Sequence, residues 1–217
     1  GLTGPQLHSS AQDLAQLVVA LICDFPEHYA LYSQKEYRYN NITQANRNRL
    51  LWLDPAVDGV KTGHTENAGY CLVASAKRGP RRLLSVVMGA ASDGMRTQES
   101  QKLLNFGFQF FDSVKLYGKD QEVSRLRVWK GAQNTVRAGF LEDFTLSLPK
   151  GMAENLKASL VSQQPLLAPV LKGQRIATLK LSLDDRPYGE YPVVALETVP
   201  VAGMIGRAWD AMRLWFE

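Results

Sequence analysis

Residues 58–65 read Asp-Gly-Val-Lys-Thr-Gly-His-Thr, and this stretch decides how the rest of the chain is interpreted. It places a cation, a hydroxyl and a glycine in consecutive positions between two runs with the composition of strands. Alternate side chains of a strand point to opposite faces, so we expect Lys61 and Gly63 on one face and Thr62 and His64 on the other. At the border of a cleft, Lys61 would supply positive charge and Thr62 a neutral donor. Gly63 would let a ligand approach the backbone closely.

The Lys-Thr-Gly triplet is the third signature of penicillin-binding proteins and class A β-lactamases, after Ser-x-x-Lys and a Ser-Asp-Asn type element. The flanking runs extend the match: Asn46-Arg47-Asn48-Arg49-Leu50-Leu51-Trp52 before the triplet and Ala68-Gly69-Tyr70-Cys71-Leu72-Val73-Ala74-Ser75-Ala76 after it. With these runs, the whole chain closely resembles the low-molecular-mass penicillin-binding proteins that act as D-alanyl-D-alanine carboxypeptidases, the penicillin-binding protein 5/6 group.

The composition is that of an ordinary globular protein: 45% of the 217 residues are hydrophobic and 21% are charged. The length allows one large domain or two smaller ones. The net charge of +4 comes from scattered Lys and Arg residues, not from a block, so we expect no nucleic-acid partner. Cys23 and Cys71 lack metal-type spacing and are interpreted as buried free thiols, although a disulfide stays possible. We expect no metal site and no cofactor.

The sequence by itself leaves the cellular compartment open. No apolar run approaches the ~20 residues of a transmembrane helix, and residues 1–5 lack the order of a signal peptide.

Residues 1–116 have the pattern of an α/β unit, which the resemblance identifies as part of a β-lactamase/transpeptidase-like domain. Ser9 or Ser10 can cap a helix that Pro26 stops. Asn40-Asn41 indicates a hairpin, and strands at residues 70–76 and 83–88 are expected to pair across a Gly79-Pro80 turn. A second helix is expected from Ser92, with an apolar stripe that reaches Val114 and covers a sheet.

Residues 117–201 are expected to form a small all-β domain. Short alternating runs at residues 123–129, 144–148, 176–183 and 193–199 are separated by turn signals. No titratable cluster in this region looks catalytic, so we interpret it as a structural or spacer domain.

Residues 202–217 have the pattern of an amphipathic helix. Met204, Ile205, Ala208, Trp209, Met212, Trp215 and Phe216 recur at helical spacing, with Arg207, Asp210, Arg213 and Glu217 on the other side. Such a helix can lie in a membrane interface through residues 203–217, or dock on its own domain or on a partner. The resembling family is anchored to the bacterial inner membrane by such a helix, which implies a periplasmic protein attached peripherally to that membrane.

The resemblance also implies roles for site residues. It assigns Lys61 to the hydrogen-bonded network of the cleft and the Thr62 hydroxyl to the terminal carboxylate of a peptide or β-lactam. The backbone N–H of His64 would be the second oxyanion donor, so its imidazole is not the candidate base. Arg47 and Arg96 match family arginines near the carboxylate, with a solvated surface role as the alternative for each.

The nucleophile and general base of the family are expected outside these residues. Ser147-Leu148-Pro149-Lys150 matches the Ser-x-x-Lys spacing, but it ends a β-run and contains a proline that a helix would not tolerate. Tyr39-Asn40-Asn41 resembles a Tyr-x-Asn variant at a hairpin turn. We reject both, and expect the chain to be roughly the C-terminal half to two-thirds of such an enzyme, inactive alone and prone to aggregate through uncovered strand edges.

The sequence therefore predicts part of a serine-type D-alanyl-D-alanine carboxypeptidase. The parent protein would remove the terminal D-alanine of peptidoglycan pentapeptides through an acyl-enzyme, and β-lactam antibiotics would inhibit it covalently. The alternative is a non-catalytic, membrane-attached binding module that keeps only the cleft wall. A soluble class A β-lactamase ranks lower because it would lack the β-domain and the tail.

Overall fold

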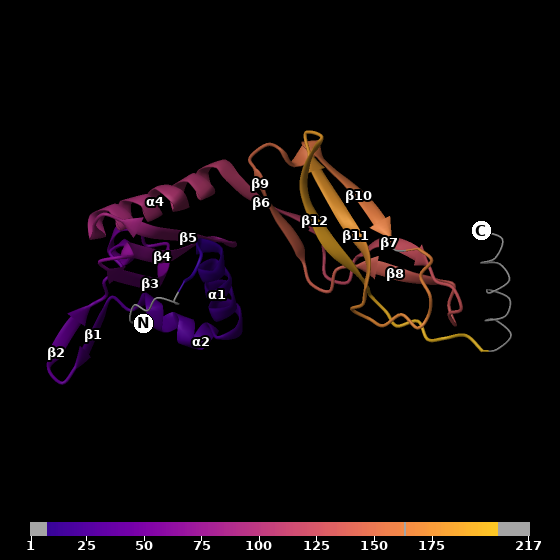
Figure 1. Ribbon diagram of the computed structural model, residues 1–217, viewed down its shortest axis with the longest axis horizontal. Coiled ribbons are helices and arrows are strands. Elements are labelled where there is room, and N and C mark those ends of the chain that lie inside the picture. Colours follow the sequence, from indigo (N-terminus) through magenta and orange to yellow (C-terminus); the bar gives the residue numbers. More distant parts are fainter. Residues whose placement is uncertain (1–7, 163, 204–217) are drawn as a thin grey trace. The chain divides into compact units, whose positions relative to one another are not determined.

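The computed structural model describes residues 8–162 and 164–203 (Figure 1). The chain divides into two compact units, Gly1–Phe111 and Asp112–Glu217, and no buried cluster of described residues is shared between them. The first mixes helices and strands, and the second consists almost entirely of strands. The α/β unit followed by an all-β unit is thus confirmed. The amphipathic pattern from residue 204 onward lies outside the described residues.

The first unit is built on a three-stranded antiparallel sheet in the order β3-β4-β5. Its elements are α1 (Ala11–Asp24), α2 (Pro26–Tyr29), the 3₁₀ helix η1 (Ala30–Ser33), β1 (Glu36–Tyr39), β2 (Ile42–Ala45), α3 (Leu50–Leu53), β3 (Val57–Thr65), β4 (Gly69–Arg78), β5 (Arg81–Ala90) and α4 (Asp93–Phe110). In Figure 1, α4 lies on one side of this sheet and α1 on the other.

The two faces of the sheet pack into two cores, as the alternation of a strand requires. Leu72 and Ala74 of β4 pack with Leu104 and Phe108 of α4. Val73 points the other way and joins the cluster that contains Val18 of α1.

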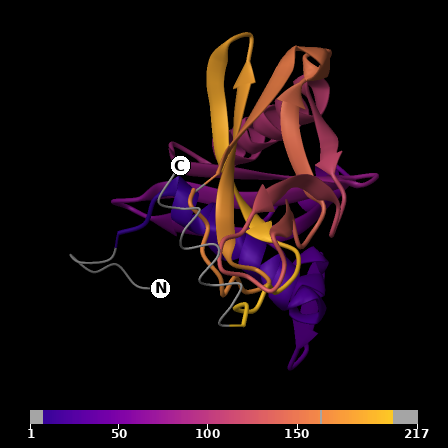
Figure 2. The same ribbon diagram turned by 90° about the vertical axis from the view of Figure 1, so that its right-hand side faces the viewer.

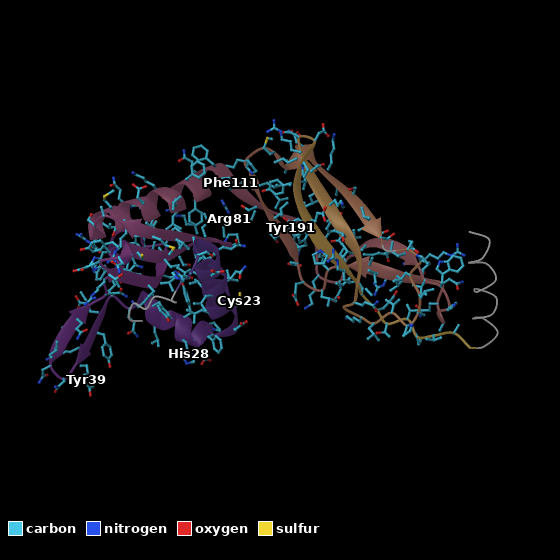
Figure 3. The ribbon with its side chains drawn as sticks, viewed as in Figure 1. Cys23, His28, Tyr39, Arg81, Phe111 and Tyr191 are labelled. Atoms are coloured by element: carbon cyan, nitrogen blue, oxygen red, sulfur yellow. The ribbon has the colours of Figure 1, made fainter. Side chains whose placement is uncertain are left out.

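Local signals place the start of α1 and the β1-β2 turn where the sequence predicts them. Ser10 and Asp13 form a reciprocal capping box at the start of α1, with the Asp13 N–H donating to Ser10 Oγ at 3.1 Å. Asn40 and Asn41 have φ of 47° and 61°, so both adopt the left-handed conformation that a tight hairpin requires. Tyr39 lies at the tip of this β1-β2 hairpin (Figure 3).

A polar cluster of Tyr29, Asp58, Ser75 and Arg82 ties β3, β4 and β5 to α2. Asp58 Oδ1 accepts hydrogen bonds from Tyr29 Oη and Arg82 Nη1, both at 2.7 Å. Arg82 Nη1 also donates to Ser75 Oγ at 2.5 Å. Burial alone would raise the pKa of Asp58, but the hydrogen bonds from Arg82 and Tyr29 outweigh it and lower that pKa. The cluster fixes β3 three residues before the Lys-Thr-Gly triplet.

We expect Tyr29→Phe to destabilise the first unit by about 1 kcal/mol, because it leaves Asp58 with one donor fewer. Burial raises the pKa of Tyr29 from 10.0 to about 12. A raised pKa contributes stability that is complete below pH 10 and is lost as the pH rises through about 12. Denaturant unfolding at pH 8 and pH 11 measures both effects, and the loss between these two pH values should shrink in the variant.

Tyr37→Phe is the matched control for this change, because Tyr37 is 62% exposed on the hairpin. It should leave the unfolding free energy within about 0.5 kcal/mol of the wild-type value. An equal loss in both variants would contradict the structural role of the Tyr29 hydroxyl.

The predicted extension of the second helix to Val114 is wrong. Helix α4 ends at Phe110, and Phe111 begins the strand β6 (Phe111–Tyr117), which pairs with β9 of the second unit. Val114 packs against the core of that unit. The division between the units accordingly follows Phe111, whereas the sequence interpretation placed it after residue 116.

The second unit contains a five-stranded sheet in the order β10-β11-β12-β8-β7 and the two-stranded sheet β6-β9. Its further elements are β7 (Glu122–Arg127), β8 (Thr135–Gly139), β9 (Phe144–Pro149), the 3₁₀ helix η2 (Ala153–Asn155), β10 (Leu156–Ser162), β11 (Arg175–Leu183) and β12 (Arg186–Ala195). Val136, Ile176, Val193 and Val199 are fully buried in one core. Figure 2 turns these orange and yellow strands toward the viewer.

The cysteines differ from the expected pair of buried thiols. Both are free, but Cys23 is exposed and Cys71 is half-buried. Among the described residues no helix alone has both the length and the apolar composition to cross a membrane, although α1 and residues Pro26–Ser33, a pair bent by 111°, meet those criteria jointly.

Candidate functional site

A cavity of about 420 Å³ in the first unit brings together most of the predicted site residues. Its lining residues are Arg47, Arg49, Thr62, Gly63, His64, Tyr70, Asp93 and Arg96. They come from the segment before α3, from β3, from the start of β4 and from the first turn of α4. Lys61 does not line this cavity. It borders a separate, largely apolar groove of about 320 Å³ with Thr62 and Gly63.

The strand register explains this division. Thr62 lies opposite Leu72 and His64 opposite Tyr70, so both side chains belong to the face covered by α4. Lys61 lies opposite Val73 on the face covered by α1, as the alternation of the sequence predicts. The ring centroids of His64 and Tyr70 are 4.0 Å apart, so the Tyr70 ring covers one side of the imidazole.

The backbone of the Lys-Thr-Gly triplet is accessible in two respects. In the three-stranded sheet, β3 is an edge strand with β4 as its only strand neighbour among the described residues. A Cβ built on Gly63 would meet, as its nearest described neighbour, Cys71 Cβ at 3.9 Å. The packing of the first unit therefore does not itself require glycine here, and a ligand can approach both the strand edge and Gly63.

Asn48 fixes the two arginines that precede α3. Its side chain is 1% exposed, and Nδ2 donates to the Gly59 carbonyl at 2.9 Å while Oδ1 accepts from the Leu50 N–H at 3.2 Å. The inward side chain of Asn48 leaves Arg47 and Arg49, one on each side of it, exposed at the cavity. Arg47 has no carboxylate partner among the residues that the structure describes.

Arg96 differs from these two arginines because it is 4% exposed. Its Nη1 donates to the carbonyls of Gly63 at 3.0 Å and Cys71 at 3.2 Å, and its Nη2 pairs with Asp93. The guanidinium also lies over the Tyr70 ring, 5.4 Å from its centroid. Arg96 thus holds the end of β3 in place, and most of its donors already have acceptors.

The sequence interpretation missed Arg49, Tyr70 and Asp93 as lining residues. Arg49 follows Arg47 by two residues and Asp93 precedes Arg96 by three residues on a helix, a spacing that brings side chains together. These two signals were available in the sequence. Tyr70 required the register of β3 with β4.

Neither of the two motifs that the sequence interpretation rejected contributes a residue to the described lining of this cavity. Ser147 belongs to β9 in the second unit, and its carbonyl accepts a hydrogen bond from Tyr188 Oη at 2.5 Å. Asn40 and Asn41 form the hairpin turn. His28 contacts the Phe25 ring at 6.2 Å. Within residues 8–162 and 164–203 no group of three His, Cys, Asp or Glu side chains is arranged to hold a metal ion.

Two family models match the chain, one in each unit. Residues 1–92 match the family described as D-alanyl-D-alanine carboxypeptidase. Residues 111–201 match the family described as penicillin-binding protein 5, C-terminal domain. Together they include the Lys-Thr-Gly triplet and the second unit as far as residue 201.

Curated proteins and solved structures agree with these matches. The chain is 44% identical to D-alanyl-D-alanine carboxypeptidase DacC of Escherichia coli K12 over 218 residues, which is 100% of this chain and 54% of that protein. It is 41% identical to DacA of the same organism, with the same coverage. The crystal structure of penicillin binding protein 5 from Haemophilus influenzae matches with a TM-score of 0.82 and 40% identity, covering 92% of this chain and 59% of that one. The chain spans about half the length of the curated relatives it matches.

Proposed function

Because the chain belongs to the D-alanyl-D-alanine carboxypeptidase family, we propose that it is part of a serine-type enzyme that removes the terminal D-alanine of peptidoglycan pentapeptides. One observation carries the proposal. The Lys-Thr-Gly triplet lies on an edge strand, and its threonine and glycine open into a cavity lined by arginines. An edge strand can pair with an extended peptide, and guanidinium groups suit a terminal carboxylate.

The reaction divides between these residues and a nucleophile that we place elsewhere in the whole protein. A serine Oγ attacks the carbonyl of the penultimate residue, the peptide C–N bond breaks, and the D-alanine amine leaves with a proton. Water then cleaves the ester and restores the serine. The backbone N–H of His64 is the proposed second oxyanion donor, and Lys61 supplies a cation to the cleft.

Carboxylate binding falls to Thr62 and the arginines. Half-buried Thr62 and exposed Arg47 both line the cavity, where the hydroxyl and the guanidinium can reach a ligand. Arg96 adds positive potential, while its hydrogen bond to the Gly63 carbonyl keeps the triplet in position. Gly63 lets the ligand approach the strand. β-Lactam antibiotics carry a similarly placed carboxylate and would acylate the same serine.

The second unit and the tail have supporting roles in this proposal. We assign the second unit to a spacer role, because its core is apolar. Residues 202–217 would attach the protein to the periplasmic surface of the inner membrane through their apolar face. Vesicle co-sedimentation with and without these residues tests the attachment.

We expect Thr62→Val to lower kcat/KM of the whole protein for a peptide ending in D-Ala-D-Ala by roughly 10- to 100-fold. The substitution keeps the shape but removes one hydrogen bond to a charged group. For the same peptide with a C-terminal amide, the variant and the wild type should be nearly equal. Thr43→Val, on the exposed strand β2, is the control and should behave as wild type. Equal losses on the acid and the amide would contradict the carboxylate role of Thr62.

A further inference from the structure

The cavity carries more positive charge than one carboxylate can balance. Among the residues that the structure describes, Arg47, Arg49 and Arg96 line it with a single acid, Asp93. Three guanidinium groups and one carboxylate leave two positive charges. The terminal carboxylate of a bound peptide would balance one of them. No described lining residue balances the other, and in a concave site a potential of one sign concentrates anions.

The uncompensated charge is best assigned to Arg49. Arg96 is buried and donates to two carbonyls and to Asp93. Arg49 has a side chain that is 64% exposed, and its one ion pair among the described residues is a 3.5 Å contact with Asp93, which Arg96 already engages. The guanidinium of Arg49 can therefore turn to a ligand without leaving Asp93 unpaired.

The backbone around Arg49 is fixed even though its side chain is largely exposed. Asn48 is held by Gly59 and Leu50, and Arg49 directly precedes α3, whose Leu50 and Leu51 are buried. The side chains of Arg47 and Arg49 consequently project from the same anchored segment, one on each side of Asn48. Each of the two guanidinium groups can bind a carboxylate of its own. The pair therefore suits a ligand with two carboxylates better than a ligand with one.

We propose that this cavity takes a ligand with two neighbouring carboxylates, and that Arg49 binds the second. This inference rests on the proposed function, in which Thr62 and Arg47 bind the terminal carboxylate. The corresponding ligand class is a peptide whose C-terminal D-residue has an acidic side chain. Arg49 is then a specificity-determining residue that extends the enzyme beyond substrates ending in D-alanine.

The test compares two dipeptides that differ by one charge, N-acetyl-D-Ala-D-Glu and N-acetyl-D-Ala-D-Gln. We expect the whole protein at low salt to bind the acidic dipeptide at least about fivefold more tightly by calorimetry or NMR titration. Arg49→Gln should reduce this ratio to about one. Arg38→Gln, on the exposed hairpin, is the matched control and should keep it. No preference in the wild type, or a preference that survives Arg49→Gln, would overturn the inference.

A hydrolysis assay separates this inference from the proposed function. The binding preference depends on the eight described lining residues and not on the catalytic serine, so binding can be measured whether or not the protein hydrolyses a peptide. If the whole protein prefers the acidic dipeptide but hydrolyses no peptide ending in D-Ala-D-Ala, the carboxypeptidase function fails and the two-carboxylate site stands. If it hydrolyses that peptide but binds both dipeptides equally, the function stands and the role of Arg49 fails.

Discussion

Lys61→Ala is expected to slow the acylation of the whole protein by benzylpenicillin roughly 100-fold or more. Removing one preorganised donor or cation from an acyl-transfer site has an effect of this size, because it acts where charge develops in the transition state. The Lys61 side chain is exposed, and its Nζ donates to the Thr62 carbonyl at 2.5 Å within the triplet itself. The loss should appear in the acylation rate measured with a fluorescent penicillin.

The stability of the variant separates chemistry from folding. Because Lys61 is exposed, Lys61→Ala should shift the thermal midpoint by little. Lys77→Ala is the matched control, since Lys77 is an exposed lysine of the neighbouring strand β4 and lies outside both cavity linings. An acylation rate that is unchanged in Lys61→Ala, or equally reduced in both variants, would contradict the role of the triplet lysine.

Gly139→Ala is expected to destabilise the second unit by about 3 kcal/mol. Gly139 lies in β8 and pairs with Glu122 of β7 on one side and Val194 of β12 on the other. A Cβ at this position would lie 2.3 Å from the Gln121 carbonyl oxygen and 2.9 Å from Leu196 Cδ1. A backbone atom cannot move aside as the end of a side chain can, so the strands must separate or the core must repack.

For a unit of this size, that loss corresponds to a fall of roughly 10 °C or more in the thermal midpoint. Differential scanning calorimetry should show the shift in the transition of the second unit. Gly203→Ala provides the control, because a Cβ there meets no described heavy atom within 4 Å. A Gly139→Ala protein with the wild-type midpoint would show that the register of β8 between β7 and β12 is wrong.

The sequence predicted those parts of the fold that depend on short-range signals. The Ser10 cap, the Asn40-Asn41 turn and the strand pair around Gly79 follow from residues within a few positions of one another. The end of α4 does not follow from such short-range signals. Val114 keeps the helical spacing from Phe110, yet β6 forms because it pairs with β9, about 30 residues further along. A long-range pairing of this kind overrides a local pattern and is invisible to it.

The strand β12 illustrates a second limit. A turn signal was expected between the runs at 176–183 and 193–199, and Asp184 and Asp185 there do adopt positive φ. The strand nevertheless begins directly afterwards at Arg186 and includes Pro187, which faces an irregularity in the ladder beside Ser182. A proline at such a place is tolerated because the regular ladder is already interrupted there. The sequence interpretation began this strand only at residue 193.

For the site, the period of a strand was enough to separate Thr62 and His64 from Lys61. The strand period was not enough to show that Arg47 and Arg96 differ in burial. Both are arginines in the expected region, but one is exposed and the other is buried against the Gly63 carbonyl. That difference depends on how the first turn of α4 packs on the ends of β3 and β4, which no local pattern encodes.

The most direct test of a serine carboxypeptidase that carries this Lys-Thr-Gly edge is the denatured mass of the whole polypeptide before and after incubation with benzylpenicillin. We predict a mass above the 24.1 kDa of these 217 residues and a gain of one covalently bound penicillin. A folded, monodisperse protein that gains no mass would contradict the acyl-enzyme and would leave a binding module that keeps the cleft wall without the nucleophile.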